Sequence, residues 1–334
     1  MATAPLVDGY GRVHRDLRIS VTDRCNFRCT YCMPAEGMQW LPRDELLTFE
    51  EITRVARVCV EVLGIDAIRL TGGEPTVRAH LAVLVRQLAG LREGGRPLDL
   101  AMTTNGVTLR TLAGDLRTAG LDRVNVSLDT LRPDRFRELT RRDQLDSVLD
   151  GIDAAAAAGF APVKVNTVVM RGVNDDELVD LAAFGRDRGV TVRFIEWMPL
   201  DADQRWEGDA VVGQDEIVAA IGAVFPLDPV PVRGSAPAER FVYRDGQGEI
   251  GVIPSVTHAF CGSCDRIRLT ADGQLRSCLF AVDEVDLRAL LRSGADDAEL
   301  AAAVRGCVAD KWAGHMIGQV TFIRPRRSMS QIGG

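Results

Sequence analysis

The feature that most constrains the fold is a regular alternation of short strand-like runs with longer amphipathic stretches over the first two-thirds of the chain. The strand-like runs are 17–21, 67–71, 98–103, 123–128, 163–169 and 191–197. The helical stretches between them are 50–63, 81–91, 109–119, 145–158 and 175–188. Repeated strand–helix units predict a parallel sheet. Six strands are two short of a complete eightfold barrel, so we expect an α/β fold with an open six-stranded (βα)6 barrel.

Four of the expected strands carry polar side chains at every second position. The polar members are Arg18, Ser20, Arg69, Thr71, Asn125, Ser127, Asp129, Lys164 and Asn166. Successive side chains of a strand point to opposite faces, so helices should cover the apolar face and the polar face should point into the barrel. Such a lumen cannot pack dry without a large desolvation cost, and we expect it to hold an anionic ligand. The alternative is a sheet with one face open to water.

The pattern changes after residue 200. A Pro-rich segment, 226–237, indicates a linker, and hairpins are expected at 240–253, around 245–248, and at 266–279, around 271–273. Helices are expected at 285–292 and 296–308, before a tail that ends in Gly333-Gly334. We therefore divide the chain into a partial barrel at 12–200 and a C-terminal region at 201–334.

Composition narrows the functional classes. The net charge of −7 argues against a nucleic-acid partner. No apolar run approaches the roughly 20 residues of a membrane span. The first eleven residues lack the basic start and apolar core of an export signal. We therefore expect a cytoplasmic protein with no membrane partner. Of the 40 Lys and Arg residues only Lys164 and Lys311 are Lys, which hints at a use for the compact ammonium.

Six of the eight cysteines fall into two tight groups, and the first lies directly after the first expected strand. Cys25, Cys29 and Cys32 share one short loop, where their thiolates can converge on one soft metal centre. A structural zinc and an electron-carrying cubane each take four protein ligands. Three ligands on a four-iron cluster leave one iron open for another molecule. The alternatives are a zinc completed by a distant residue such as His14, and no metal.

The second group consists of Cys261, Cys264 and Cys278. The hairpin at 266–279 should bring Cys278 close to Cys264, with Arg266 and Arg268 on the same face as Cys264. Adjacent guanidiniums suit phosphate, so we expect a metal centre beside a phosphate-binding pair. The alternative is a zinc knuckle with His258. The remaining cysteines, Cys59 and Cys307, lie in apolar helical contexts typical of core packing.

The first cysteine loop, together with Thr71-Gly72-Gly73-Glu74-Pro75 after the second strand, resembles the radical S-adenosylmethionine (SAM) enzymes. With the second group the resemblance narrows to the GTP 3′,8-cyclases, the lyases of the first step of molybdenum cofactor biosynthesis. It extends from Arg12 to Gly334. Its further motifs are 16–23, 103–106, 125–129, 164–166, 193–198 and 260–264. The implied fold is an incomplete, TIM-like radical SAM barrel with a C-terminal α+β extension carrying a second cluster.

The resemblance also implies cofactors, ligands and partners. The cofactors are SAM and two [4Fe–4S] clusters, each with three Cys ligands, and GTP becomes (8S)-3′,8-cyclo-7,8-dihydroguanosine 5′-triphosphate with no catalytic residue beyond the cofactors. The implied SAM contacts are Tyr31, Gly73, Ser127 and Met198; the GTP contacts are Arg18, Arg69, Thr103, Lys164, Arg266, Ile267 and Arg268; and the tail residues that enter the site are Gly333 and Gly334. The implied partners are a low-potential electron donor and the downstream cyclic pyranopterin monophosphate synthase. The oligomeric state, including a homodimer, is left open.

Two other functions stay open from the sequence. One is a radical SAM enzyme with an extra cluster that acts on a peptide, although such enzymes usually carry more C-terminal cysteines. The other is a non-catalytic metal-binding regulator that senses oxygen or binds nucleic acid. The acidic charge balance and the lack of a basic recognition helix weigh against that regulator.

Overall fold

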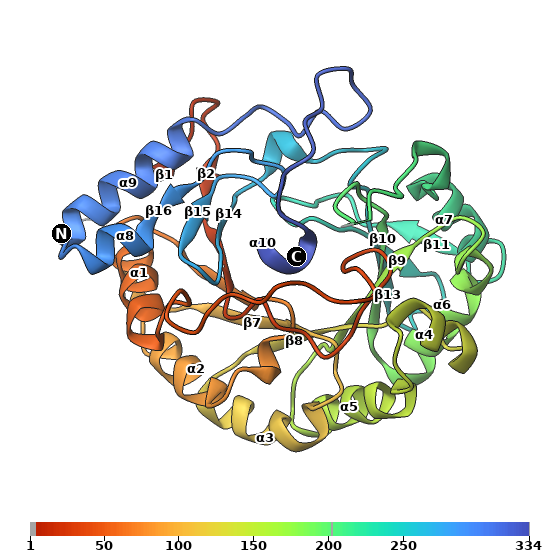
Figure 1. The fold of residues 1–334 in the computed structure, drawn as a ribbon. Coiled ribbons are helices and arrows are strands. Elements are labelled where there is room, and N and C mark those ends of the chain that lie inside the picture. Colours follow the sequence, from red (N-terminus) through yellow and green to blue (C-terminus); the bar gives the residue numbers. More distant parts are fainter. Residues whose placement is uncertain (1–4, 202, 334) are drawn as a thin grey trace.

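The computed structural model describes residues 5–201 and 203–333. A curved sheet forms the centre of the molecule and helices surround it. The C-terminal tail lies inside the curve of the sheet (Figure 1). Within these residues the main sheet has twelve strands, in the order β11-β12-β13-β10-β9-β8-β7-β4-β3-β14-β15-β16.

The six predicted barrel strands lie side by side and are all parallel, which confirms the partial barrel. They are β3 (Asp16–Ser20), β4 (Ala67–Thr71), β7 (Asp99–Thr104), β8 (Arg123–Ser127), β9 (Lys164–Val169) and β10 (Thr191–Glu196). The register places Arg18 beside Arg69 and Asn125 beside Lys164. Polar positions of neighbouring strands therefore share one face.

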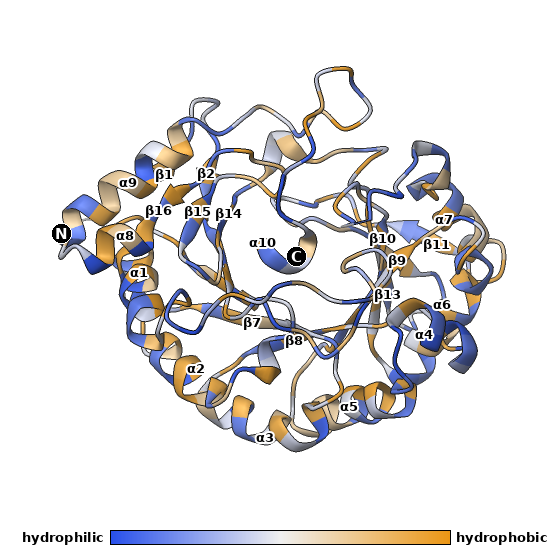
Figure 2. Ribbon diagram, in the orientation of Figure 1, coloured by the Kyte–Doolittle hydropathy of each residue, from blue (hydrophilic) through white to orange (hydrophobic). Residues whose placement is uncertain are grey.

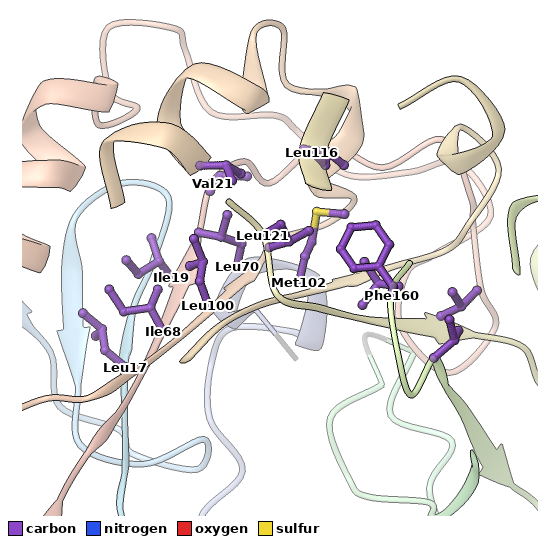
Figure 3. Close-up of a cluster of buried hydrophobic side chains, with 14 of the residues drawn as sticks. Leu17, Ile19, Val21, Ile68, Leu70, Leu100, Met102, Leu116, Leu121 and Phe160 are labelled. Carbon is purple, nitrogen blue, oxygen red and sulfur yellow. The ribbon is translucent and has the colours of Figure 1, made fainter. Parts of the chain in front are cut away.

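Helices cover the outer face of this sheet. They are α1 (Phe49–Glu61), α2 (Leu81–Ala89), α3 (Leu109–Ala119), α4 (Pro133–Thr140), α5 (Leu145–Ala157) and α6 (Leu178–Arg188). Their apolar sides face the strands (Figure 2). Outward-facing side chains such as Ile19, Leu70 and Met102 pack under them in a buried layer (Figure 3). Burial of this apolar layer is the main force that holds the helices on the sheet.

Two of these helices differ from the sequence expectation. The helix α4 was not predicted; it begins with Pro133, a residue whose fixed φ suits a first helical turn. The expected helix at 175–188 splits into a short 3-10 turn, Asp175–Glu177, and α6. The other helices end where expected, and Gly120 terminates α3 with a φ of +105° that only glycine adopts readily.

The C-terminal third lengthens the sheet at both edges. Both predicted hairpins are confirmed: β12 (Glu239–Tyr243) with β13 (Glu249–Ile253), and β14 (Arg266–Leu269) with β15 (Gln274–Arg276). The strand β13 pairs in parallel with β10, and β14 pairs in parallel with β3. The described parts of the two predicted regions thus share one sheet, while the division near residue 200 stays a prediction.

Smaller elements complete the fold. The remaining strands are β1 (Leu6–Val7), β2 (Val13–His14), β5 (Arg92–Glu93), β6 (Arg96–Pro97), β11 (Leu227–Pro229) and β16 (Val285–Asp286). The remaining α-helices are α7 (Gln214–Gly222), α8 (Leu287–Arg292), α9 (Asp297–Ala309) and α10 (Met329–Ile332). Three further 3-10 turns are η1 (Pro75–Val77), η3 (Gly208–Ala210) and η4 (Cys261–Ser263). None of the helices in the described ranges is long and apolar enough to span a membrane.

Candidate active site

The polar strand faces form a cationic lumen. Burial, followed by the positive charges of Arg193, Arg123 and Arg69, lowers the pKa of Lys164 to about 8. Burial, followed by Arg69, Arg123 and Arg18, lowers the pKa of Arg193 to about 10. Like charges that lower one another's pKa are close together and under-compensated. The lumen therefore has the electrostatics of a site for a polyanion.

Carboxylates offset only part of this charge. Arg69 donates to Asp99 at 3.0 Å and to Asp16 at 3.4 Å, and Arg123 also pairs with Asp99. These carboxylates lie at the amino-terminal ends of β3 and β7, so they hold the guanidiniums at one end of the lumen.

Two guanidiniums in the lumen keep buried donors without acceptors. Arg18 Nε and Arg266 Nη2 have no hydrogen-bond partner within the described part of the chain. Burial lowers the pKa of Arg18 to about 10, and Arg266 and Arg69 add to the effect against the opposing charge of Asp16. Buried donors in folded proteins are nearly always paired. An anionic ligand would supply the missing acceptors.

Sequence reasoning missed two members of this lumen, Arg123 and Arg193. Arg193 lies between buried Val192 and Phe194 on β10, so it follows the same period-two pattern as the polar positions on four other strands. That signal would have found it. Arg123, at the first position of β8, carries the same signal, because Val124 and Val126 alternate with polar neighbours.

The first cysteine loop follows β3, at the carboxyl end of the barrel strands, where enzyme sites of this architecture lie. It packs closely on the loop after β4: Gly73 N donates to Thr22 O at 2.8 Å, and Glu74 N donates to Arg24 O at 2.8 Å. A Cβ atom on Gly73 would lie 2.4 Å from Arg24 O. This close approach requires glycine at position 73, and its contact with SAM stays a prediction.

The three thiols of this loop lie together in a sheltered place. Burial raises the pKa of Cys25 to about 11, and burial followed by the charge of Cys25 raises that of Cys32 to about 12. Burial, then Cys32, Asp129 and Cys25, raises the pKa of Cys29 well above its usual value. Three thiols that oppose one another's ionisation need a cationic centre to hold them as thiolates. The trio fits an iron–sulfur cluster in this respect.

The structure argues against the zinc alternatives for both trios. His14 lies on β2, with Nε2 3.1 Å from Asp8 and Nδ1 3.5 Å from the ammonium of Lys311, which contacts the second trio. His258 Nδ1 lies 3.1 Å from the Thr257 hydroxyl. Across residues 5–201 and 203–333 no three His, Cys, Asp or Glu side chains are arranged to hold a single metal ion. Both ring nitrogens of His14 are therefore engaged beside the second trio, which argues against a zinc at the first trio completed by His14.

The predicted SAM contacts lie at or after the carboxyl ends of barrel strands: Tyr31 follows β3, Gly73 follows β4, Ser127 ends β8 and Met198 follows β10. The Tyr31 hydroxyl donates to Asp129 Oδ2 at 2.7 Å, and Val168 N donates to the other oxygen of Asp129 at 2.8 Å. Asp129 follows shortly after β8, the strand that ends with Ser127. Met198 lies beyond the end of β10 and packs against the C-terminal tail. Their contact with SAM stays a prediction.

Among the predicted GTP contacts, Thr103 lies on β7 and accepts a hydrogen bond from Asn125 at 3.4 Å. Ile267, on β14, points away from this group: it is fully buried in the apolar core. Any contact of residue 267 with GTP would therefore come from its backbone.

The second trio joins two segments. Cys261 and Cys264 lie at the 3-10 turn η4, and Cys278 follows β15. Burial, then the charges of Cys278 and Cys264, raises the pKa of Cys261. Cys264 differs: burial opposes its ionisation, but Arg266 and Lys311 outweigh burial and lower its pKa to about 7. The predicted closeness of Cys264, Cys278 and Arg266 is confirmed.

The C-terminal tail lies between the two trios. Arg268 donates to the carbonyl of Gly333, and Ser330 hydrogen-bonds to Cys32, which partly offsets the burial of that thiol. Ile332 packs with Leu200 and Phe280 in a small separate core. The described part of the predicted tail thus enters the lumen, and Gly334 lies outside the described residues.

Comparisons with known proteins agree with this geometry. A family model described as the radical SAM superfamily matches residues 19–185, and one described as Molybdenum Cofactor Synthesis C matches residues 190–317. A relative from Streptomyces coelicolor named GTP 3′,8-cyclase is 52% identical over 331 residues, 98% of this chain and 96% of that protein. One of the same name from Corynebacterium glutamicum is 49% identical over 336 residues, 98% of this chain and 89% of that protein.

Solved structures show the same fold at low identity. Streptococcus suis SuiB bound to S-adenosylmethionine has a TM-score of 0.59 and 14% identity, over 88% of this chain and 68% of that one. The protein anSMEcpe with bound AdoMet has a TM-score of 0.56 and 15% identity, over 85% of this chain and 81% of that one.

Proposed function

We propose that this chain, which belongs to the GTP 3′,8-cyclase family of radical SAM enzymes, converts GTP to (8S)-3′,8-cyclo-7,8-dihydroguanosine 5′-triphosphate in the first step of molybdenum cofactor biosynthesis. The observation that carries the proposal is the cationic lumen that extends between two cysteine trios. A triphosphate carries the negative charge that the lumen lacks and the acceptors that Arg18 Nε and Arg266 Nη2 lack, whereas a peptide backbone carries no charge.

The first trio would hold the cluster that cleaves SAM. When bound to Cys25, Cys29 and Cys32, a four-iron cluster supplies the electron for that cleavage, which yields methionine and a 5′-deoxyadenosyl radical. The chain positions SAM: we infer that Tyr31, fixed by Asp129, lies beside the adenine, and that Gly73, Ser127 and Met198 complete the contacts.

The lumen would bind the triphosphate. Arg18, Arg69 and Lys164 are the predicted contacts, and Arg193 lies close enough to Arg69 and Arg18 to join them. Arg18 Nε and Arg266 Nη2 would donate to phosphate oxygens. A triphosphate fixed at several points would place its ribose C3′ within reach of the radical, and such positioning lowers the barrier by removing translational and rotational freedom.

The second trio would orient the base. A cluster on Cys261, Cys264 and Cys278 would offer its open iron to the guanine edge, beside the backbone of Ile267. Arg268 would brace the tail through Gly333, so that the tail would keep water from the place where C3′ and C8 of the nucleotide are joined.

An anaerobic assay tests the function. Reconstituted enzyme is incubated with dithionite, SAM and GTP, and the products are identified by mass spectrometry. We expect cyclised nucleotide and 5′-deoxyadenosine in equal amounts. Omission of SAM, or replacement of GTP by ATP, is the control and should give no cyclised nucleotide. Formation of 5′-deoxyadenosine without any cyclised nucleotide from GTP would contradict the proposed substrate.

Partners and location follow from the chemistry. We infer that a low-potential electron donor reduces the first cluster, and that cyclic pyranopterin monophosphate synthase takes up the product. Both requirements suit the cytoplasm, and a homodimer stays a prediction. Sedimentation of the reconstituted enzyme would give the oligomeric state.

A further inference from the structure

We propose that Lys311 tunes the second cluster by donating a charged hydrogen bond from its ammonium to the sulfur of Cys264, and that residues of the β1–β2 hairpin hold Lys311 in place. The proposal rests on a cluster at the second trio. It makes Lys311 a positioning residue that acts on the cluster through its ligand and does not contact GTP.

Lys311 is buried, with 4% of its surface exposed. Its Nζ atom lies 2.8 Å from Arg266 O, 3.5 Å from His14 Nδ1 and 3.6 Å from Cys264 Sγ. These three directions match the three donors of an ammonium. Its hydrogen-bond partners in the described ranges include no carboxylate, so the neighbouring thiolate sulfurs are the anions that its charge faces.

His14 is oriented to accept from this ammonium. Its Nε2 lies 3.1 Å from Asp8 Oδ2, so the ring proton belongs on Nε2 and the lone pair of Nδ1 faces Lys311. Burial, followed by the charge of Lys311, lowers the pKa of His14 to about 4 despite Asp8, so the ring is neutral near pH 7. A neutral imidazole can accept a hydrogen bond from the ammonium of Lys311, whereas a charged imidazolium would repel it.

Arg12 holds together the segment that carries Cys261 and Cys264 and the segment that follows Lys311. Its guanidinium donates to Cys261 O at 2.7 Å, to Trp312 O at 2.7 Å and to Ala313 O at 3.0 Å. Its Nε atom donates to Asp8 at 2.6 Å. One side chain therefore ties the cysteine turn to the chain directly after Lys311.

Within the described residues, no Lys or Arg side chain donates a hydrogen bond to a sulfur of the first trio; Arg28 donates to Cys25 O at 2.7 Å, and its charge acts on Cys25 without such a bond. The hydrogen-bond donors at its thiols are neutral: the backbone N of Phe27 and the side chain of Asn105 at Cys25, and Ser330 at Cys32. A charged donor withdraws more electron density from a sulfur than a neutral one does, and it stabilises the reduced cluster, which carries one more negative charge. Lys311 should therefore raise the reduction potential of the second cluster alone, and strengthen its open iron as an acceptor for a nitrogen ligand.

Potentiometric titration followed by electron paramagnetic resonance tests this in the reconstituted enzyme, with both clusters and without SAM or GTP. In Lys311→Met we expect the potential of the second cluster to fall. A tenfold drop in its reduced-to-oxidised ratio at a fixed potential corresponds to 59 mV for a one-electron couple. Lys311→Arg should stay near the parent value, and Lys311→Gln, a neutral donor, should lie between the two. The potential of the first cluster should not change.

The matched control is Lys164→Met, which removes the other lysine of the chain without touching a cysteine. It should leave both potentials unchanged. An unchanged second-cluster potential in Lys311→Met would overturn the proposal, and so would equal shifts of both clusters. Loss of the second cluster from all three Lys311 variants, measured by iron content, would assign Lys311 to packing instead. No readout involves GTP, so failure here is separate from failure of the proposed reaction.

Discussion

The two cysteine trios differ in how the chain surrounds them. The first lies in one loop, where burial shelters its thiols and the groups that hydrogen-bond to the sulfurs are neutral, while the charge of Arg28 acts on Cys25 from the Cys25 carbonyl. The second joins the turn η4 to the end of β15, with Arg266 and Lys311 at Cys264 and Arg12 at the Cys261 carbonyl. The sulfurs of the first trio receive hydrogen bonds from neutral groups, and a sulfur of the second receives one from a charged group.

This difference matches the two tasks. Reduction of a sulfonium needs an electron of low potential, and a buried cluster without charged donors keeps its reduced state high in energy. Binding a nucleotide needs an electrophilic iron beside cations. The charged surroundings of the second trio supply the cations and would make a bound iron more electrophilic. The surroundings of each trio, more than its ligand set, would then separate the two proposed roles, electron donation and substrate binding.

The most direct test of this difference between the two trios removes one ligand from each. Cys29→Ser should abolish both 5′-deoxyadenosine and cyclised nucleotide. Cys264→Ser should abolish only the cyclised nucleotide, and its iron content should fall from about eight to about four per chain, because one cubane is lost. Liquid chromatography with mass spectrometry measures both products. Equal loss of 5′-deoxyadenosine in the two variants would show that the trios do not divide the tasks.

The next test removes a cation of the lumen. Arg193→Met should weaken GTP binding by about 10- to 100-fold, because hydrogen bonds to charged groups contribute roughly 1.5–3 kcal/mol. The matched control is Arg244→Met, since Arg244 is exposed and pairs with Asp228 at 2.9 Å. Isothermal titration calorimetry measures both affinities. If the two variants bind GTP alike, Arg193 does not belong to the binding site.

Much of the barrel could be predicted because its signals are local. The alternation on β3 and β4 predicts two strands to within one residue and places Arg18 and Arg69 on one face. The first trio was equally accessible, since Cys25, Cys29 and Cys32 share one loop. In these two places the type of each side chain and its spacing in the sequence are enough to predict which residues lie close together.

The surroundings of the second trio could not be predicted, because they depend on contacts between distant segments. Lys311 meets His14 across almost the whole chain, and Arg12 meets Cys261 from the N-terminal hairpin. The parallel pairing of β13 with β10 and of β14 with β3 is also long-range. The periodicity of a sequence does not predict such pairings, and the sequence distinguished Lys311 only as one of two lysines.

A smaller effect should follow from a change in the tail that bridges the two trios. A Cβ atom at Gly333 would lie 2.4 Å from Thr71 Oγ1, so Gly333→Ala must displace the tail. Gly318 has the same φ of +79° with nothing within 4 Å, which makes Gly318→Ala a control for backbone strain alone. We expect GTP turnover to fall about tenfold in the first variant, since small misplacements are costly in catalysis, and to hold in the second. Steady-state assays measure both, and equal rates would remove the tail from the mechanism.

The smallest expected effect is a pH dependence of GTP affinity that comes from the lumen. The pKa of Lys164 is lowered to about 8 by burial and then by Arg193, Arg123 and Arg69, against the opposing charge of Glu249. A bound triphosphate raises that pKa, so binding takes up a proton when the free amine is neutral. Affinity should thus hold below about pH 8 and fall above it by at most about tenfold per pH unit. Calorimetry in buffers of different ionisation enthalpy measures the uptake. The Lys164→Arg variant stays charged, so its affinity for GTP should not depend on pH over this range. If the parent enzyme also takes up no proton on binding GTP, Lys164 does not lie beside the phosphates.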